Sequence, residues 1–342
     1  MNSFGRLFRI GIFGESHGEL IGVTLDGVPS GIDLDPVDFE SDLKKRKGEL
    51  NENDETRSFL TSRKESDDLK IVSGVFNGKT TGAPITLFIK NEDLNSKSYE
   101  DFRNLPRPGH ADFASQIKYN GFNDYRGGGI FSGRLTAGLV CAAVIAKKVI
   151  KKINENIIIK AIVNSVGCFP YPSEDAFELL RKIKNENDSI GGTIFCTIDN
   201  LPAGIGEPFF DSLESYLSHI IFSIPGCKAI SFGLGIESPT IKGSCFNDQI
   251  INPKGTTKTN NNGGINGGIS NGNQIYFTTY FKAASSVLVK QKTIDIKTGK
   301  EVELNLGGRF DSCYVLRTPV IVEAVTAIAL LDLLFIYKTE RL

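Results

Sequence analysis

The chain has 342 residues, of which 40% are hydrophobic and 23% are charged, and its formal net charge is −1. Such a composition is typical of a globular protein with a substantial core. It excludes an overall electrostatic attraction to nucleic acid or to an acidic membrane, so a site for an anion would need basic residues gathered locally.

The N-terminus and the cysteines favour a cytoplasmic location. The first ten residues, MNSFGRLFRI, lack the continuous apolar stretch of a secretory signal peptide. No two cysteines form a C-x-x-C pair, which disfavours a zinc site, and we expect no bound metal. We expect reduced, buried thiols at Cys141, Cys168, Cys196, Cys227, Cys245 and Cys313.

A tight turn near the N-terminus holds one of only three histidines in the chain. The stretch GIFGESHGEL (11–20) places Glu15, Ser16 and His17 between two glycines, directly after a short apolar run. A rigid turn can hold an imidazole as a proton donor, because the ordinary pKa of histidine is about 6.5.

Two segments share one strand–turn–helix plan and indicate an internal duplication. Segments 22–43 and 192–217 each contain a β-branched strand, an Asp-x-x-Pro-x-Gly-Ile turn, a proline and an amphipathic helix. The matching residues are Asp26, Pro29, Gly31 and Ile32 in the first segment and Asp199, Pro202, Gly204 and Ile205 in the second. A looser echo relates 127–148 to 307–331, where glycines and an arginine precede a long apolar helix.

The stretch SGVFNGKTTG (73–82) resembles a phosphate-binding P-loop only superficially. A P-loop has four residues between its glycines, whereas Gly74 and Gly78 are separated by three. We therefore expect a hairpin turn here rather than a nucleotide site.

A second histidine and an arginine lie on a loop that proline and glycine stiffen. In LPRPGHADF (105–113), Arg107 and His110 could face one ligand with little entropy lost on binding. The third histidine, His219, lies in an amphipathic helix and is expected to be structural.

Two glycine-rich stretches remain open to more than one interpretation. DYRGGGIFSGR (124–134) combines three glycines with Arg126, Ser132 and Arg134 before a long helix, which suits either an anion site or a tight strand-to-helix turn. NNNGGINGGISNG (260–272) would be a disordered loop by composition, but its glycines also permit close approach to a planar ligand.

The remaining elements predict an α+β fold. A helix should begin at Ser173 and bury Ala176, Leu179, Leu180 and Ile183, and the apolar run 320–337, interrupted by two acids, predicts a buried helix. Because strands and helices do not alternate regularly, we expect a β-sheet sandwich core with helices outside. We expect one domain, 1–342, with two pseudo-repeated halves at about 1–150 and 190–342.

Together these stretches resemble chorismate synthase over nearly the whole chain and in the same order. The motifs are FGESHG at 13–18, RPGHAD at 107–112, DYRGGG…SGR at 124–134, NNGGINGGISNG at 261–272, and R-x-D followed by VIVEA at 309–324. The resemblance implies conversion of 5-enolpyruvylshikimate-3-phosphate to chorismate in the shikimate pathway. The reaction eliminates phosphate and requires reduced FMN without net redox change. The substrate carries a phosphate and two carboxylates, which explains the arginines on glycine-rich loops.

The resemblance also implies roles for individual residues. His17 would be a proton donor against the flavin, His110 a proton donor near the leaving phosphate, and Asp311 the acceptor of a proton from flavin nitrogen-5. The substrate anions would be bound by Arg46, Arg107, Arg134 and Arg317. The flavin would contact Arg46, Ile130, Phe131, Ser132, Pro225, Gly226, Gly267, Lys282, Ala283, Ala284, Ser285, Ser286 and Arg309.

The family resemblance further implies a homotetramer. Arg46 and Arg57 match positions linked to NADPH in members that reduce their own flavin; we expect an external reductant instead.

Several positions depart from the family pattern. Phe310 stands where a histidine is usual, Ile130 stands where arginine or histidine is usual, and the basic loop 44–58 lacks its proline. An active enzyme is therefore weighed against a catalytically weak paralogue that binds flavin, and against a phosphate-binding structural protein.

Overall fold

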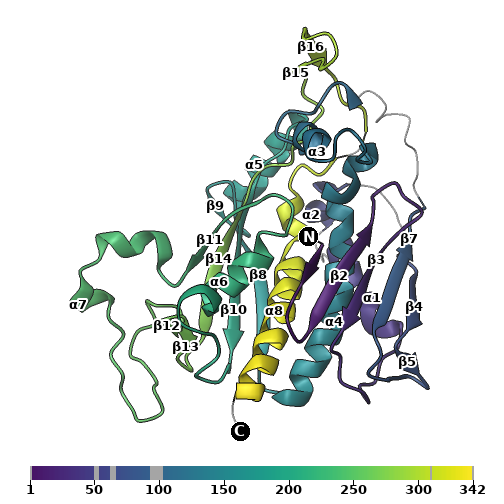
Figure 1. Cartoon of the computed structure of the whole chain (residues 1–342). Coiled ribbons are helices and arrows are strands. Elements are labelled where there is room, and N and C mark those ends of the chain that lie inside the picture. Colours follow the sequence, from purple (N-terminus) through teal and green to yellow (C-terminus); the bar gives the residue numbers. More distant parts are fainter. Residues whose placement is uncertain (1, 50–53, 62–66, 93–102, 309, 341–342) are drawn as a thin grey trace.

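The computed structural model describes residues 2–49, 54–61, 67–92, 103–308 and 310–340 (Figure 1). Two antiparallel five-stranded sheets dominate it. The first has the order β1 (Ser3–Phe4), β2 (Arg9–Gly14), β3 (Leu20–Asp26), β7 (Ile85–Lys90), β4 (Leu69–Ser73). The second has the order β11 (Cys227–Phe232), β14 (Ile275–Phe281), β10 (Gly192–Asp199), β8 (Ile158–Val166), β9 (Phe169–Pro170).

Eight α-helices, three short hairpins and several short 3-10 helices complete the described residues. The helices are α1 (Val37–Lys47), α2 (Asp54–Ser58), α3 (Asp112–Lys118), α4 (Thr136–Ile153), α5 (Glu174–Asn185), α6 (Leu213–Ile221), α7 (Gly243–Phe246) and α8 (Pro319–Glu340). The hairpins are β5 (Val75–Phe76) with β6 (Lys79–Thr80), β12 (Ile265–Asn266) with β13 (Ile269–Ser270), and β15 (Gln291–Ile294) with β16 (Glu301–Leu304).

The central strands β10 and β14 of the second sheet alternate strictly between buried and less buried residues. In the second sheet, β10 pairs with β14 so that Cys196 lies opposite Phe277 and Ile198 opposite Ile275, and all four side chains are buried. The period of two places these residues on one face, which must be covered.

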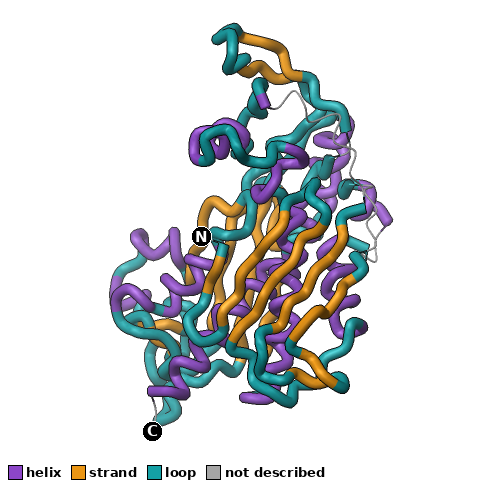
Figure 2. Tube along the Cα trace, turned by 45° about the vertical axis from the view of Figure 1, so that its right-hand side comes forward, coloured by secondary structure: helices purple, strands orange, loops and turns teal. Residues whose placement is uncertain are grey.

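The α+β class is confirmed, but the expectation that the helices lie outside the sandwich is wrong. The long helices α4 and α8 pack against each other between the sheets; α4 also contacts β3, and α8 contacts β8. Figure 2 shows the strands of the first sheet in front of the helices. The physical reason is that α8 is apolar around most of its circumference, so only an interior position covers it on all sides.

The two halves contain the same turn. Thr80 of the β5–β6 hairpin donates its hydroxyl to the Pro29 carbonyl (2.6 Å) and accepts from the Ile32 amide (3.0 Å). Ser270 of the β12–β13 hairpin bonds Pro202 and Ile205 in the same way, at 2.6 and 2.9 Å. Moreover β3 and β10, which precede these turns, are each the middle strand of their sheet. The division of the chain into repeated halves stays a prediction, and these bonds support it.

A buried carboxylate in α8 anchors the N-terminal segment. Asp332 accepts the backbone amides of Arg6 (2.8 Å), Leu7 (2.7 Å) and Phe8 (2.8 Å), and the Tyr216 hydroxyl. Asp332 is fully buried, and these four donors compensate for the desolvation of its charge.

Other local predictions are confirmed. The segment 75–80 is a hairpin whose turn residues, Asn77 and Gly78, both have positive φ. Ser173 caps α5 by accepting the Ala176 amide at 3.2 Å. Of the four side chains expected to be buried in this helix, Ala176 and Leu180 are buried, whereas Leu179 and Ile183 are only partly buried. The cysteine expectation needs correction, because Cys168 and Cys245 are exposed, the former between β8 and β9 and the latter in the short helix α7; the other four are buried.

Candidate active site

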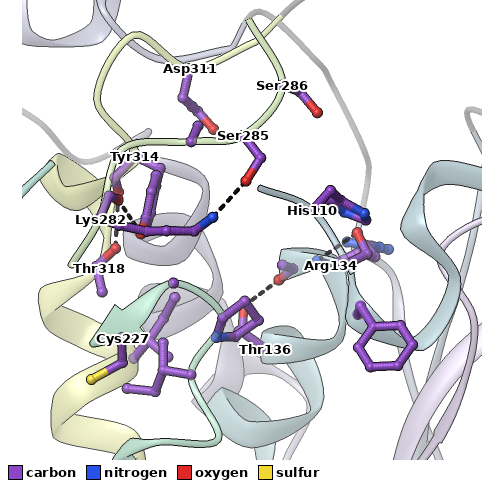
Figure 3. A pocket seen from close by; sticks show the side chains of 18 of the residues that line it. His110, Arg134, Thr136, Cys227, Lys282, Ser285, Ser286, Asp311, Tyr314 and Thr318 are labelled. Atoms are coloured by element: carbon purple, nitrogen blue, oxygen red, sulfur yellow. Dashed lines mark hydrogen bonds between the residues drawn. The ribbon is translucent and has the colours of Figure 1, made fainter. Parts of the chain in front are cut away.

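A cavity of about 640 Å³ opens at one end of the sandwich (Figure 3). Its walls come from the end of α1 and from segments in the ranges 107–111, 127–136, 222–227, 282–286 and 310–321. In Figure 3, His110 and Arg134 lie on one side, Lys282, Tyr314 and Thr318 on the other, and Asp311 and Ser286 at the upper rim. Loops that are distant in the sequence thus converge on one volume.

The described lining is strongly basic although the chain as a whole is nearly neutral. It contains six basic side chains, Arg46, Lys47, Arg107, Arg134, Lys282 and Arg317, and one acidic side chain, Asp311. This concentration of positive charge in a cavity attracts an anion, as expected for a site built from locally gathered basic residues.

The triple-glycine turn lies between the two predicted catalytic histidines. Gly127 lies against the His17 ring, because a Cβ there would be 2.2 Å from His17 Cδ2. On Gly128 a Cβ would be 3.2 Å from His110 Cε1 and Nε2. Both glycines also have positive φ. A larger residue at either position would therefore be disfavoured by its backbone conformation as well as by the contact with the imidazole ring. His110 lines the cavity, whereas His17 is 3% exposed and lies behind Gly127 rather than in the wall.

Asp112 joins Arg107 and His110 into one buried cluster. Its Oδ1 is 2.6 Å from His110 Nδ1, and its Oδ2 accepts from Arg107 Nε at 2.7 Å. Burial alone would raise the pKa of Asp112, but the hydrogen bonds from Arg107 and His110 hold this pKa well below its usual range. The ionised carboxylate orients both side chains, and Arg107 Nη2 also lies 3.1 Å from His110 Nδ1 and 3.3 Å from His110 Nε2.

Two further arginines share a second buried carboxylate. Arg134 Nη1 donates to Asp67 Oδ1, and Arg46 Nη2 lies 3.5 Å from Asp67 Oδ2. All three side chains are buried. Burial by itself would raise the pKa of Asp67, but the charges of Arg46 and Arg134 outweigh it and lower the pKa.

The segment Lys282 to Ser286 is bonded to the loop that carries His110. Lys282 Nζ donates to the Gly109 carbonyl (2.6 Å) and to Ser285 Oγ (2.7 Å), and Ser285 Oγ donates to the same carbonyl (2.8 Å). Burial, and secondarily the charge of Lys228, lower the pKa of Lys282. These bonds hold two walls of the cavity at a fixed separation.

Asp311 is paired with an arginine of the lining. Its Oδ2 accepts from Arg317 Nη2 at 2.7 Å, and its Oδ1 accepts the Thr61 amide at 2.9 Å. Arg317 Nε is buried and makes no hydrogen bond among the described residues.

Most residues singled out from the sequence line the cavity. They are Arg46, Arg107, His110, Ile130, Phe131, Ser132, Arg134, Pro225, Gly226, Lys282, Ala283, Ala284, Ser285, Ser286, Asp311 and Arg317. Gly267 does not, because it lies in the turn between β12 and β13. Arg57 is exposed on α2, and His219 is exposed on α6, where its ring contacts Phe4. Arg309 lies outside the described residues.

Sequence reasoning missed several residues that the fold brings to the site. Tyr314 lines the cavity and donates its hydroxyl to the Lys282 carbonyl at 2.8 Å. Asp112 follows His110 by two residues in the RPGHAD motif, so its position was a usable signal. Asp67 carried no such signal, since nothing in the sequence around it indicates that this aspartate faces Arg46 and Arg134.

Comparisons with known proteins agree along the whole chain. A family model described as chorismate synthase matches residues 8–335. A chorismate synthase from Chitinophaga pinensis is 48% identical over 341 residues, covering 100% of this chain and 98% of the relative. A second, from Thermococcus gammatolerans, is 41% identical over 350 residues and covers 96% of each chain. A solved crystal structure of chorismate synthase matches with a TM-score of 0.73 at 24% identity, covering 98% of this chain and 93% of the other, which supports the fold alone.

Proposed function

Because the chain belongs to the chorismate synthase family, we propose that it converts 5-enolpyruvylshikimate-3-phosphate to chorismate, using reduced FMN without net redox change. The protein is an enzyme of a lyase family that serves aromatic amino acid biosynthesis. The observation that carries the proposal is the cavity itself, where six basic side chains meet two predicted proton-transfer residues, His110 and Asp311.

The cavity suits a flavin beside an anionic substrate. Its volume of about 640 Å³ lies within the range of cofactor sites, roughly 300–1,000 Å³. Gly133 lines it, and a Cβ on Gly133 would meet no protein atom within 4 Å, so this glycine leaves space that a ligand can fill. Ile130, Phe131, Pro225 and Tyr314 supply apolar surface for a planar ring.

When bound, reduced FMN supplies electron density to a substrate ring that loses phosphate. The chain's own residues bind and orient the reactants. Arg46, Arg107, Arg134 and Arg317 hold the phosphate and carboxylates of the substrate as charge-assisted hydrogen-bond donors. His110 gives a proton to the departing phosphate, and the carboxylate of Asp112, 2.6 Å from His110 Nδ1, orients the imidazole ring at the cavity wall.

His17 and Asp311 would serve proton transfer on the flavin side. His17 lies directly behind Gly127, which lines the cavity. A proton on His17 would therefore stabilise negative charge on a ligand that lies on the other side of Gly127. The hydrogen bond from Arg317 to Oδ2 holds the Asp311 carboxylate in place at the cavity rim, where it would accept a proton.

Further features of the proposal come from the family. We propose a cytoplasmic homotetramer supplied with reduced flavin by an external reductant, with NADPH acting only if this chain reduces flavin itself.

Anaerobic assay of the purified protein tests the proposal. With 5-enolpyruvylshikimate-3-phosphate and chemically reduced FMN, chorismate should form together with one equivalent of phosphate, and oxidised FMN should give none. NADPH with oxidised FMN forms a separate arm that detects an intrinsic flavin reductase. Flavin binding without chorismate would favour the weak paralogue instead.

A further inference from the structure

Two of the arginines that line the cavity are held from behind by one carboxylate. Asp67 contacts Arg134 through Oδ1 and Arg46 through Oδ2, but Asp67 does not line the cavity. Its side chain is 2% exposed, compared with 6% for Arg46 and 5% for Arg134. The carboxylate therefore does not contact a ligand in the cavity and reaches it through the two guanidinium groups and through its charge.

Two positive charges share the carboxylate of Asp67. One carboxylate lies between two guanidinium groups, and guanidinium stays protonated at any accessible pH. Two like charges a few ångströms apart in a buried site repel strongly unless an anion lies between them. The negative charge of Asp67 reduces this repulsion, and from behind the two guanidinium groups it also repels an anion bound in the cavity.

The surrounding bonds fix Arg134 in two further directions. Its Nε donates to Asn91 Oδ1 at 3.2 Å. Asn91 in turn donates to the carbonyls of Glu15 (3.0 Å) and Gly18 (2.9 Å), which flank His17 in the N-terminal turn. Asp67 itself has a φ of 52°, which aspartate adopts only at a modest cost and which indicates that its environment determines its conformation.

We propose that Asp67 is a positioning residue whose negative charge holds Arg46 and Arg134 side by side in the orientation that the leaving phosphate requires. The proposal rests on the proposed function for the identity of the substrate. Its anion-binding part is independent of that function, because it concerns only two arginines and a phosphate group.

Removing this charge should separate binding from turnover. Without Asp67 the two guanidinium groups repel, and a bound anion relieves that repulsion. Ground-state affinity for phosphate should therefore increase, while the orientation that favours departure of the phosphate is lost.

The test compares three variants with inorganic phosphate as the probe. Asp67→Asn should bind phosphate about 10-fold more tightly than the native protein, the effect of one neighbouring charge, measured by isothermal titration calorimetry. Its kcat should fall roughly 10²-fold with no increase in KM. Asp67→Glu keeps the charge but displaces it, so phosphate affinity should be native while kcat is about 10-fold reduced.

Asp42→Asn is the matched control, because Asp42 is ion-paired with Lys147 and lies on the same helix as Arg46 but does not line the cavity. It should leave phosphate affinity and kcat unchanged. An Asp67→Asn protein with a lower melting temperature but native phosphate affinity would overturn the proposal, since a purely structural carboxylate predicts that result. If Asp67→Asn does not fold, a native kcat in Asp67→Glu overturns it. Should the native protein form no chorismate, the phosphate titrations still decide the role of Asp67.

Discussion

His110 Nδ1 lies 2.6 Å from Asp112 Oδ1, and Arg107 holds the same carboxylate. The native pKa of Asp112 is lowered, whereas an unfolded aspartate has a pKa of about 3.9. Its ionised form therefore stabilises the fold above pH 4, and that stability is lost as pH falls through the lowered native pKa.

The variant Asp112→Asn should lower the free energy of unfolding by about 3 kcal/mol at pH 7, because it leaves Arg107 buried without its counter-charge. Denaturant unfolding of both proteins between pH 7 and pH 3 measures the difference. The difference should hold down to about pH 4 and shrink below it. Growth of the difference in acid would contradict the assignment.

The three histidines should differ in their effect on turnover according to whether they lie beside the triple-glycine turn. His17→Ala and His110→Ala should each reduce turnover roughly 10²-fold or more, the usual effect of losing a general acid. Both should still bind FMN, as fluorescence titration would show. His219→Ala is the control, since His219 is exposed on α6 and contacts only Phe4 among aromatic rings of the described residues. Equal losses in all three variants would refute the roles inferred from loop position.

Gly133 offers a way to obstruct the cavity without straining the fold. A Cβ there meets no protein atom within 4 Å and its φ is ordinary, so Gly133→Ala should unfold as the native protein does. The added methyl group should weaken FMN or substrate binding about 10-fold, as overpacking does. Gly243→Ala in α7 also meets no atom but lies away from the cavity, and should change neither property. Native binding by Gly133→Ala would show that no ligand reaches this wall.

Phe310 has two roles that one double variant can separate. It lines the cavity, and it also packs with Leu105, Leu304 and Leu306. Phe310→His combined with Ile130→Arg should tighten binding of reduced, anionic FMN more than of oxidised FMN, because positive or hydrogen-bonding groups favour the anion.

The same variant should lose about 1–3 kcal/mol of stability, since the small apolar cluster loses its aromatic member. Anaerobic FMN titration and thermal melts on one preparation measure both effects. A lower melting temperature with no gain in affinity for reduced FMN would mean that these two side chains do not face the flavin.

Exposed aromatic residues support the proposed assembly. Phe122 is 92% exposed, Phe209 86% and Phe210 93% in the single chain, and such side chains are commonly covered by a partner. Light scattering at micromolar concentration should give a mass four times that of the 37.3 kDa chain. A stable monomer would contradict this prediction.

Local elements were predictable because their signals are local. The cap of α5 at Ser173 and the Asn77–Gly78 hairpin follow from residues within a few positions of one another. The interior position of α4 and α8 could not be predicted, because hydrophobic periodicity identifies the apolar face of a helix but not the element that covers it. The pairing of Asp67 with Arg46 and Arg134 joins positions 21 and 67 residues apart, so only the fold reveals it.

The anchoring of residues 6–8 by Asp332 has a consequence for how the chain is made. The ribosome synthesises residues 6–8 first, but their anchor follows 324 to 326 residues later. At roughly 5–20 residues per second, the interval between them is on the order of tens of seconds. During that interval the amides of residues 6–8, between β1 and β2, have no Asp332 to bond, so water satisfies them until α8 has been made.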